Sequence, residues 1–137
     1  MIRHLHTTLL ATLLAGSLTL PVLAEEPDVG RREYLNACAI CHGESGNGEG
    51  ALASLLTVPV PGLRAITAQN GGTFPMLDMI HIIDGRTGLR GHGSEMPVWG
   101  AMFRNAIPED AGLYASELIV RGRVLAIAEY LRSIQEE

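Results

Sequence analysis

The chain has 137 residues, of which 15 are acidic and 10 are basic, and its formal net charge is −5 with neutral histidines. The sequence contains no lysine, so every residue counted as basic is an arginine. Nucleic-acid binding rests on cationic neutralisation of phosphates, and we therefore expect no DNA or other nucleic-acid partner. The same charge predicts repulsion from anionic lipid and attraction to basic protein surfaces.

The N-terminal segment is typical of a secretory signal peptide. A basic start containing Arg3 precedes an apolar stretch from Leu9 to Leu20, and the small residue Ala24 stands before an acidic pair. This layout predicts export with cleavage after Ala24. We expect a signal peptide over residues 1–24, a single mature domain over residues 25–137 and a periplasmic location.

An uncleaved membrane anchor is the alternative for the same segment. Thr7 to Ala24 is mostly apolar and just long enough to cross a hydrocarbon core. Its threonine and serine content and Pro21 weaken a stable span, so we favour cleavage.

The first element of the mature chain is predicted to be a helix over Val29–Ala39. Asp28 can cap its first amides. Gly30, Tyr34 and Cys38 fall on one stripe of this helix, which identifies the face that packs inward.

The two cysteines of the chain are Cys38 and Cys41, and His42 follows directly. A cysteine pair at this spacing in an exported chain is compatible with a disulfide, a redox-active dithiol, half of a metal site or haem attachment. Cys38-Ala39-Ile40-Cys41-His42 matches the C-x-x-C-H signature of c-type haem attachment. A zinc site would need two further ligands, and a thioredoxin-like dithiol would be expected near a βαβ pattern, which the sequence lacks.

The spacing of this motif has a physical basis. Two cysteines about one helical turn apart can form thioethers with the two vinyl positions on one edge of a porphyrin. His42 can then reach the iron from one face of the porphyrin. We therefore predict one covalently bound haem c, held by Cys38 and Cys41, with His42 as an axial iron ligand.

The middle of the chain reads as loops and short helices. Residues 43–50 hold four glycines and cannot continue a helix, residues 51–56 favour a short helix, and residues 58–62 are kept extended by two prolines. A further helix is predicted to open at Pro75 and to end near Gly85, and the chain is again loop-like from Thr87 to Gly100.

The last helix is the clearest element. Its apolar face is made by six residues at helical spacing, and charged residues lie largely outside it. These six residues are Val120, Val124, Ile127, Ala128, Leu131 and Ile134. No strand-like alternation of useful length appears, so the sequence predicts a small all-α domain. Its long loops need a surface to pack against, which a flat apolar macrocycle would supply.

Taken together, these motifs resemble the bacterial class I c-type cytochromes, which hold a single haem. The segment Gly93-Ser94-Glu95-Met96-Pro97-Val98-Trp99-Gly100 is similar to their distal segment. Gly30 and Tyr34 match their N-terminal helix, and Ile127-x-x-Tyr130-Leu131 matches their C-terminal helix. The resemblance covers essentially the whole mature chain and implies a cytochrome c-like fold in which these two helices cross.

The resemblance also implies a second axial ligand, which we assign to Met96. It sits in a glycine-flanked loop and is followed by Pro97, which stiffens the backbone. A thioether ligand favours reduced iron and raises the potential. The other mature methionines are Met76, Met79 and Met102. Met76 and Met79 are weaker candidates, because they fall in a helical apolar pattern that suits core packing.

His92 is the main rival of Met96 and would give a bis-histidine site of lower potential. His81 is interpreted as a surface or packing residue.

Groups around the iron ligands are assigned from the same resemblance. A histidine ligand needs an acceptor for its second nitrogen. Pro61-Gly62-Leu63 resembles the segment whose proline carbonyl plays this part in the family. Trp99 is expected to pack or hydrogen-bond near the haem edge. Three arginines are candidates to offset the haem propionates: Arg64, Arg86 and Arg90.

The sequence therefore predicts a periplasmic electron carrier that is not itself an enzyme. Its partners would be a redox protein donor and acceptor that dock transiently near the haem edge, with membrane contact only through membrane-bound partners. The alternatives are a haem-bearing relay subunit of an exported dehydrogenase or oxidase, a haem sensor or peroxidase with a labile axial site, and a haem-free dithiol module. Residues 103–117 are long for the family, and the absence of lysine removes its usual basic docking ring, so partner choice does not carry over.

Overall fold

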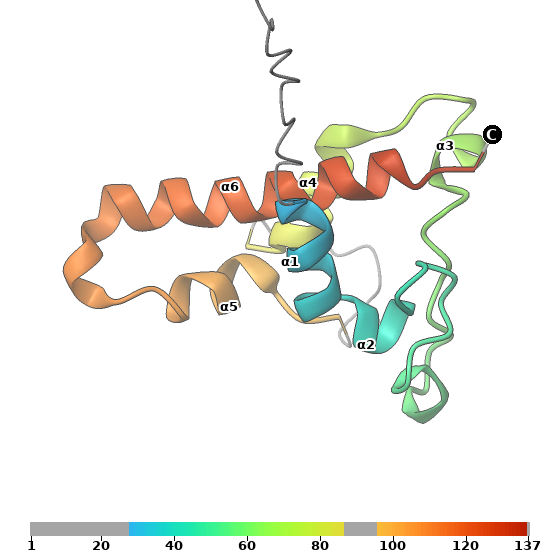
Figure 1. Cartoon of the computed structure of the whole chain (residues 1–137), viewed down its shortest axis with the longest axis horizontal. Coiled ribbons are helices and arrows are strands. Elements are labelled where there is room, and N and C mark those ends of the chain that lie inside the picture. Colours follow the sequence, from blue (N-terminus) through green and yellow to red (C-terminus); the bar gives the residue numbers. More distant parts are fainter. Residues whose placement is uncertain (1–27, 87–95, 137) are drawn as a thin grey trace, which may run out of the picture.

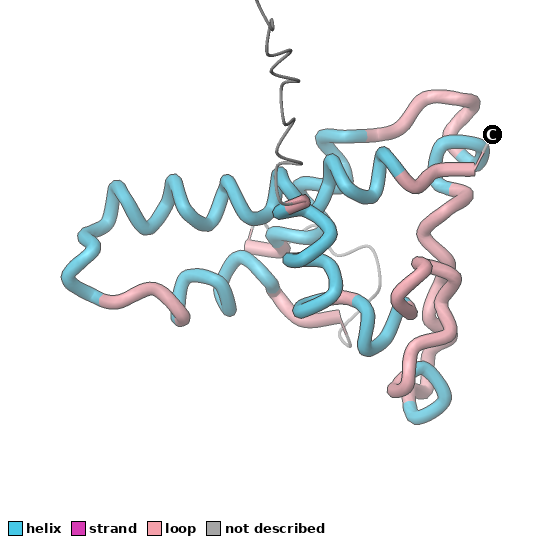
Figure 2. Tube along the Cα trace, in the orientation of Figure 1, coloured by secondary structure: helices cyan, strands magenta, loops and turns pink. Residues whose placement is uncertain are grey.

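The computed structural model describes residues 28–86 and 96–136, and within those ranges the chain is helical and contains no strand (Figure 2). The elements are α1 (Val29–Ala37), α2 (Ala39–His42), η1 (Ala53–Leu55), α3 (Ile66–Gln69), α4 (Met76–Asp84), α5 (Trp99–Asn105), η2 (Glu109–Ala111) and α6 (Gly112–Ser133). The all-α class predicted from the sequence is confirmed.

Several predictions fall outside the described ranges. These are the signal peptide over residues 1–24, the alternative iron ligand His92 and the propionate candidate Arg90. Among the helices that are described, none is long and apolar enough to span a membrane.

The first helix begins where its capping residue predicts. An Asp28 carboxylate oxygen accepts a hydrogen bond from the backbone amide of Arg31 at 2.8 Å, so one of the unpaired amides at the start of α1 is satisfied. The predicted helix over residues 29–39 is interrupted at Cys38, and α2 starts at Ala39. Cys38 therefore stands at the junction of two helices.

Helices α1 and α6 cross, and the crossing point is at Gly30 (Figure 1). A Cβ atom at Gly30 would collide with the backbone carbonyl oxygen of Ala126, so only glycine allows the two backbones this close approach. Tyr34, one turn further along α1, is fully buried, and its ring centroid lies 5.1 Å from that of Tyr130. The contact predicted between the first and last helices is present.

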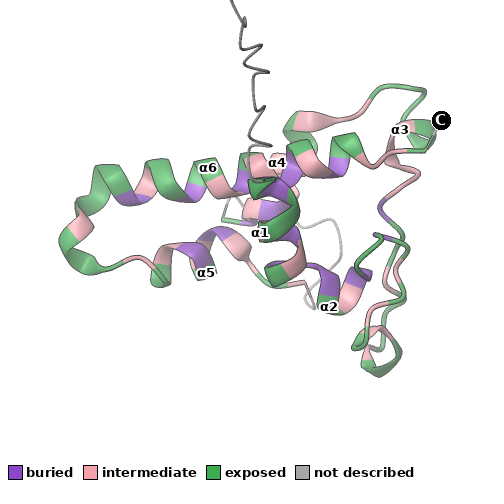
Figure 3. Ribbon diagram, viewed as in Figure 1, coloured by how far each residue is buried: buried purple, intermediate pink, exposed green. Residues whose placement is uncertain are grey.

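Helix α6 forms one side of the hydrophobic core. Its buried face is turned toward α1, α4 and α5 (Figure 3). The buried residues of this helix are Ser116, Val120, Val124, Ile127, Ala128 and Leu131. Ile134, which the sequence places on the same face, follows the helix and is partly buried against the core.

Helix α5 was not predicted, and α6 starts earlier than the sequence pattern indicates. Residues 99–105 are helical although they fall at the end of a predicted loop and the start of the segment 103–117. Phe103 of α5 is buried and anchors the helix to the core. The guanidinium carbon of Arg123 lies 3.9 Å from the Phe103 ring centroid, while its Nη2 donates to Glu33 at 2.7 Å. The segment 103–117 thus contains the end of α5, all of η2 and the first turns of α6. Helices α5 and α6 form a helical hairpin (Figure 1).

A charged cluster joins α4 to the start of α6. Arg86 donates to Asp84 at the end of α4 and, over 2.8 Å, to Glu117 on α6. Glu117 also accepts from Arg121 at 2.8 Å. Hydrogen bonds from the two arginines lower the pKa of Glu117 to about 2, and a hydrogen bond from Arg86 lowers that of Asp84. Gly100 of α5 packs so tightly on this cluster that a Cβ there would collide with Asp84.

Candidate functional site

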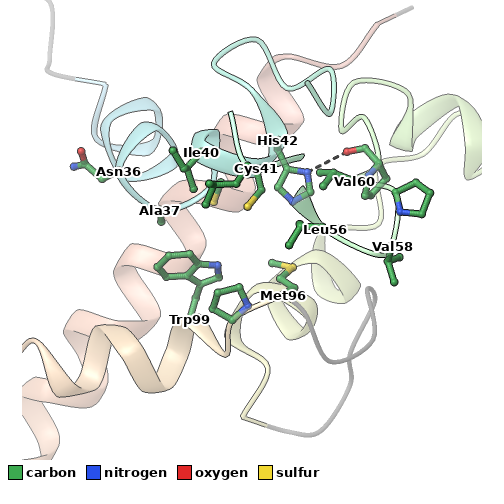
Figure 4. A pocket seen from close by; sticks show the side chains of 15 residues that line it. Asn36, Ala37, Ile40, Cys41, His42, Leu56, Val58, Val60, Met96 and Trp99 are labelled. Carbon is green, nitrogen blue, oxygen red and sulfur yellow. Dashed lines mark hydrogen bonds between the residues drawn. The ribbon is translucent and has the colours of Figure 1, made fainter. Parts of the chain in front are cut away.

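A cavity of about 330 Å³ opens between α1, α2, the segment 52–61 and the start of α5 (Figure 4). Its volume lies in the range of small-molecule and cofactor sites, and its lining is mostly apolar. The lining residues are Asn36, Ala37, Cys38, Ile40, Cys41, His42, Leu52, Leu56, Val58, Pro59, Val60, Pro61, Met96, Pro97 and Trp99. All six site residues predicted from the sequence, Cys38, Cys41, His42, Pro61, Met96 and Trp99, are among them.

The two cysteines line this cavity, and no disulfide joins them. Cys38 is 6% exposed, and burial is the main reason that its pKa rises to about 12, with smaller contributions from Cys41 and Glu33. At neutral pH Cys38 is therefore a neutral thiol. Thiolate is the nucleophilic form of cysteine, so burial makes Cys38 a poor nucleophile for disulfide exchange.

His42 ends α2 and is 7% exposed. Its Nδ1 lies 3.0 Å from the carbonyl oxygen of Pro61. A carbonyl oxygen can only accept, so Nδ1 carries the proton and Nε2 carries the lone pair of the neutral ring. Burial lowers the pKa of the imidazole, while the hydrogen bond to Pro61 opposes the shift. The structure thus holds His42 in the tautomer in which imidazole binds metals through Nε2.

The position of the Pro61 carbonyl depends on the residues that follow it. Leu63 is buried, and its backbone amide donates to the Gly46 carbonyl at 2.7 Å. The side-chain amide of Gln135 donates to the Leu63 carbonyl at 2.7 Å. Both ends of the chain segment around Leu63 are therefore tied to distant parts of the fold, and Pro61 is held beside His42.

The glycine-rich loop holds α2 from the other side. Gly48 donates its backbone amide to the His42 carbonyl at 2.8 Å, and Gly50 donates to the Cys41 carbonyl at 3.0 Å. Gly48 has φ +84° and packs against the carbonyl of Val60, so a side chain there would be both strained and crowded. The Tyr34 hydroxyl adds a bond of 2.6 Å to the Gly43 carbonyl. The loop that follows the cysteine motif is thus fixed close to it.

Met96 lies across the cavity from His42, with its sulfur turned toward the space between them (Figure 4). Met76, Met79 and Met102 are also described, and none of them lines this cavity. Met76 and Met79 pack partly buried against the core from α4, and Met102 is exposed on α5. The geometry therefore singles out the methionine that the sequence analysis selected.

Trp99 completes the wall beside Met96. Its ring centroid lies 5.6 Å from that of Phe103, so the indole joins the cavity to the buried core of α5 and α6.

The described arginines that the sequence suggested as partners of the haem propionates form ion pairs elsewhere. Arg64 pairs with Glu136 at 2.7 Å, Arg86 pairs with Asp84 and Glu117, and neither lines the cavity.

Sequence reasoning missed much of the apolar wall that the segment 52–60 forms beside α2. Leu52, Leu56, Val58 and Val60 line the cavity and were not singled out. A signal was present, because residues 58–61 alternate valines with prolines, which lack the backbone N–H that regular hydrogen bonding needs.

The donor set limits what the cavity can bind. The described residues contain no group of three or more histidine, cysteine and acidic side chains able to hold a bare metal ion. The cavity instead offers one imidazole and one thioether facing each other, two thiols on one side and an apolar wall. This set fits a flat apolar macrocycle that brings its own metal, because two axial protein ligands then suffice.

Comparisons of the chain with protein-family models, curated proteins and solved structures found no match.

Proposed function

We propose that the protein is an exported electron carrier that binds one haem c in the cavity described above. Cys38 and Cys41 would hold the haem by thioether bonds, and His42 and Met96 would be the axial iron ligands. When bound, the haem supplies one-electron exchange between Fe(III) and Fe(II). The observation that carries the proposal is that His42 and Met96 face each other across a cavity that both cysteines also line.

The chain's own residues have defined tasks in this proposal. Pro61 keeps the proton on Nδ1 of His42, which leaves the ring lone pair on Nε2, and the hydrogen bond raises the basicity of the ring. Met96 supplies a soft sulfur that favours the reduced metal. Leu56 and Val60, which are partly buried, would limit the contact of the bound group with water and so disfavour the more highly charged oxidised state. If both His42 and Met96 held the iron, the chain would leave no position on it for a substrate, which supports electron transfer over catalysis.

A specific observation favours one alternative, a relay subunit that stays bound to a larger oxidoreductase. Ile40, Leu52 and Val58 line the cavity and remain exposed, and the lining contains no aspartate, glutamate or arginine among the described residues. Leu55, beside this rim, is 74% exposed. An apolar rim suits a lasting interface better than a brief electrostatic encounter. This alternative uses the same haem and the same ligands.

Covalent attachment tests the proposal. The chain is produced in a periplasm with haem-maturation machinery, denatured, and measured by intact mass and haem staining. We expect one haem per chain in the wild type and none in the double variant Cys38→Ala/Cys41→Ala. Met102→Ala, which changes an exposed residue outside the cavity, is the matched control and should keep its haem. A wild-type chain that carries two free thiols and no haem would contradict the proposal and favour the dithiol alternative.

A further inference from the structure

The end of α4 packs closely against the first residues of α5. Gly85, the residue that caps the end of α4, is buried, and a Cβ built on it would lie 3.3 Å from a methyl carbon of Val98. A Cβ built on Gly100 would collide with the Asp84 carboxylate and would lie 2.6 Å from Nε of Arg86. The first turn of α5 therefore rests directly on the ion pair between Asp84 and Arg86.

The start of α5 has no side-chain cap of its own. Val98 stands at the N-cap position, and a valine side chain has no oxygen that could accept from the free amides of the first turn. The position of α5 therefore depends on its packing against the end of α4. Met96 stands two residues before Val98, and Pro97 between them restricts rotation of the backbone. A shift of the helix start is thus passed on to Met96.

Arg86 ties this contact to α6. Its Nη2 donates to Asp84 at 2.9 Å, and its Nη1 donates to Glu117 at 2.8 Å. The side chains of Arg86 and Asp84 are only 28% and 16% exposed, so water screens this pair less than it screens an ordinary surface ion pair. Arg86 also stands between two carboxylates that repel each other, those of Asp84 and Glu117. Without Arg86, the end of α4 would lose its charged link to α6.

We propose that Arg86 is a positioning residue for Met96, which it holds at the cavity through Asp84 and the start of α5. This inference rests on the axial ligation by Met96 proposed above. Arg86 does not line the cavity, so it acts on Met96 only through the residues between them. Its role therefore differs from that of a propionate partner, which the sequence suggested.

Loss of Arg86 should loosen Met96 without unfolding the domain. Neither Arg86 nor its two carboxylate partners belong to the hydrophobic core, which keeps all its apolar contacts when the ion pairs are removed. A less firmly held α5 raises the fraction of molecules in which Met96 has left the iron. An external iron ligand then binds more tightly in proportion to that fraction.

The test uses the haem-loaded protein with carbon monoxide as the probe. Oxidised Arg86→Gln should lose much of the weak far-red band that reports sulfur bonded to Fe(III), and the reduced variant should bind carbon monoxide about tenfold more tightly than the wild type. Its helix content, measured by circular dichroism at the same temperature, should not change. Arg121→Gln is the matched control, because it also removes a hydrogen bond to Glu117. Arg121 is 73% exposed, whereas the atoms nearest to Gly100 belong to Asp84 and Arg86.

Gly100→Ala disturbs the same contact from the side of α5 and keeps the inference testable if Arg86→Gln does not fold. The added methyl group displaces Asp84, so this variant should also lose band intensity and bind carbon monoxide more tightly. Because both substitutions act on one contact, the double variant should show less than the product of the two separate effects on affinity.

The wild-type spectrum separates the two ways in which this account can fail. A wild type without the far-red band would contradict ligation by Met96, and with it the proposed function. A wild type that shows the band, with Arg86→Gln or Gly100→Ala matching Arg121→Gln in band intensity and in affinity for carbon monoxide, would overturn the role of Arg86 alone.

Discussion

His42 donates a hydrogen bond from Nδ1 to the carbonyl oxygen of Pro61, and this contact fixes which ring nitrogen faces the cavity. The acceptor is a backbone group whose position is set by Leu63 and Gln135. The orientation of the imidazole is therefore built into the fold before any cofactor is bound, which reduces the entropy lost when a ligand is held.

The first prediction concerns this histidine. His42→Ala should greatly reduce the amount of covalently loaded protein, because the variant lacks the proposed axial nitrogen. His81→Ala is the matched control, since His81 lies on α4, is partly buried and does not line the cavity. Haem per chain, measured by intact mass after purification, distinguishes the two variants. Equal loading of both would argue against His42 as a ligand.

The second prediction compares two helical glycines. Gly30→Ala inserts a Cβ where it collides with Ala126, and it should lower the free energy of unfolding by about 1–3 kcal/mol, as overpacking does. Gly122→Ala meets open space and should raise it by up to about 1 kcal/mol. Urea unfolding at low protein concentration measures both values. A neutral effect of Gly30→Ala would mean that α1 and α6 do not cross as closely as described.

The third prediction concerns acid stability. Glu117 has a folded-state pKa of about 2 against an ordinary value of 4.5, because Arg86 and Arg121 donate to it. A lowered carboxylate pKa contributes stability that is fully present above pH 4.5 and is lost as the pH falls toward 2. Glu117→Gln should therefore be less stable than the wild type at neutral pH, and the difference should shrink through this window.

Thermal unfolding of both proteins at a series of pH values checks the sign. A difference between Glu117→Gln and the wild type that stays constant from neutral pH to pH 2 would show that the arginines do not stabilise the charged form of Glu117.

Local sequence signals predicted the parts of the fold that depend on neighbouring residues. Asp28 marks the start of α1 because a cap acts within one turn, and the stripe from Val120 to Leu131 marks α6 because its whole face is buried. Helix α5 was missed because it is short and contains Gly100, which the sequence suggests is a loop residue. Gly100 is there because the Asp84 side chain packs against it, and this contact spans distant parts of the chain.

The same distinction applies to the candidate site. The cysteine motif and His42 are contiguous, so their spacing alone indicates their chemistry. Met96 was selected from its glycine-flanked loop, from Pro97 and from resemblance, and Pro61 was selected from resemblance alone. The apolar wall could not be predicted from the sequence, because only tertiary structure brings its segment beside α2. The wall is formed by Leu52, Leu56, Val58 and Val60.

The most direct measurement of the central claim is the absorption spectrum of the oxidised, haem-loaded protein with and without Met96. We expect the wild type to show the weak far-red band that reports sulfur bonded to Fe(III). Met96→Ala should lose this band and keep its covalent haem, whereas Met102→Ala should keep both. A band that is absent from the wild type, or that survives in Met96→Ala, would contradict ligation by Met96 and with it the electron carrier proposed here.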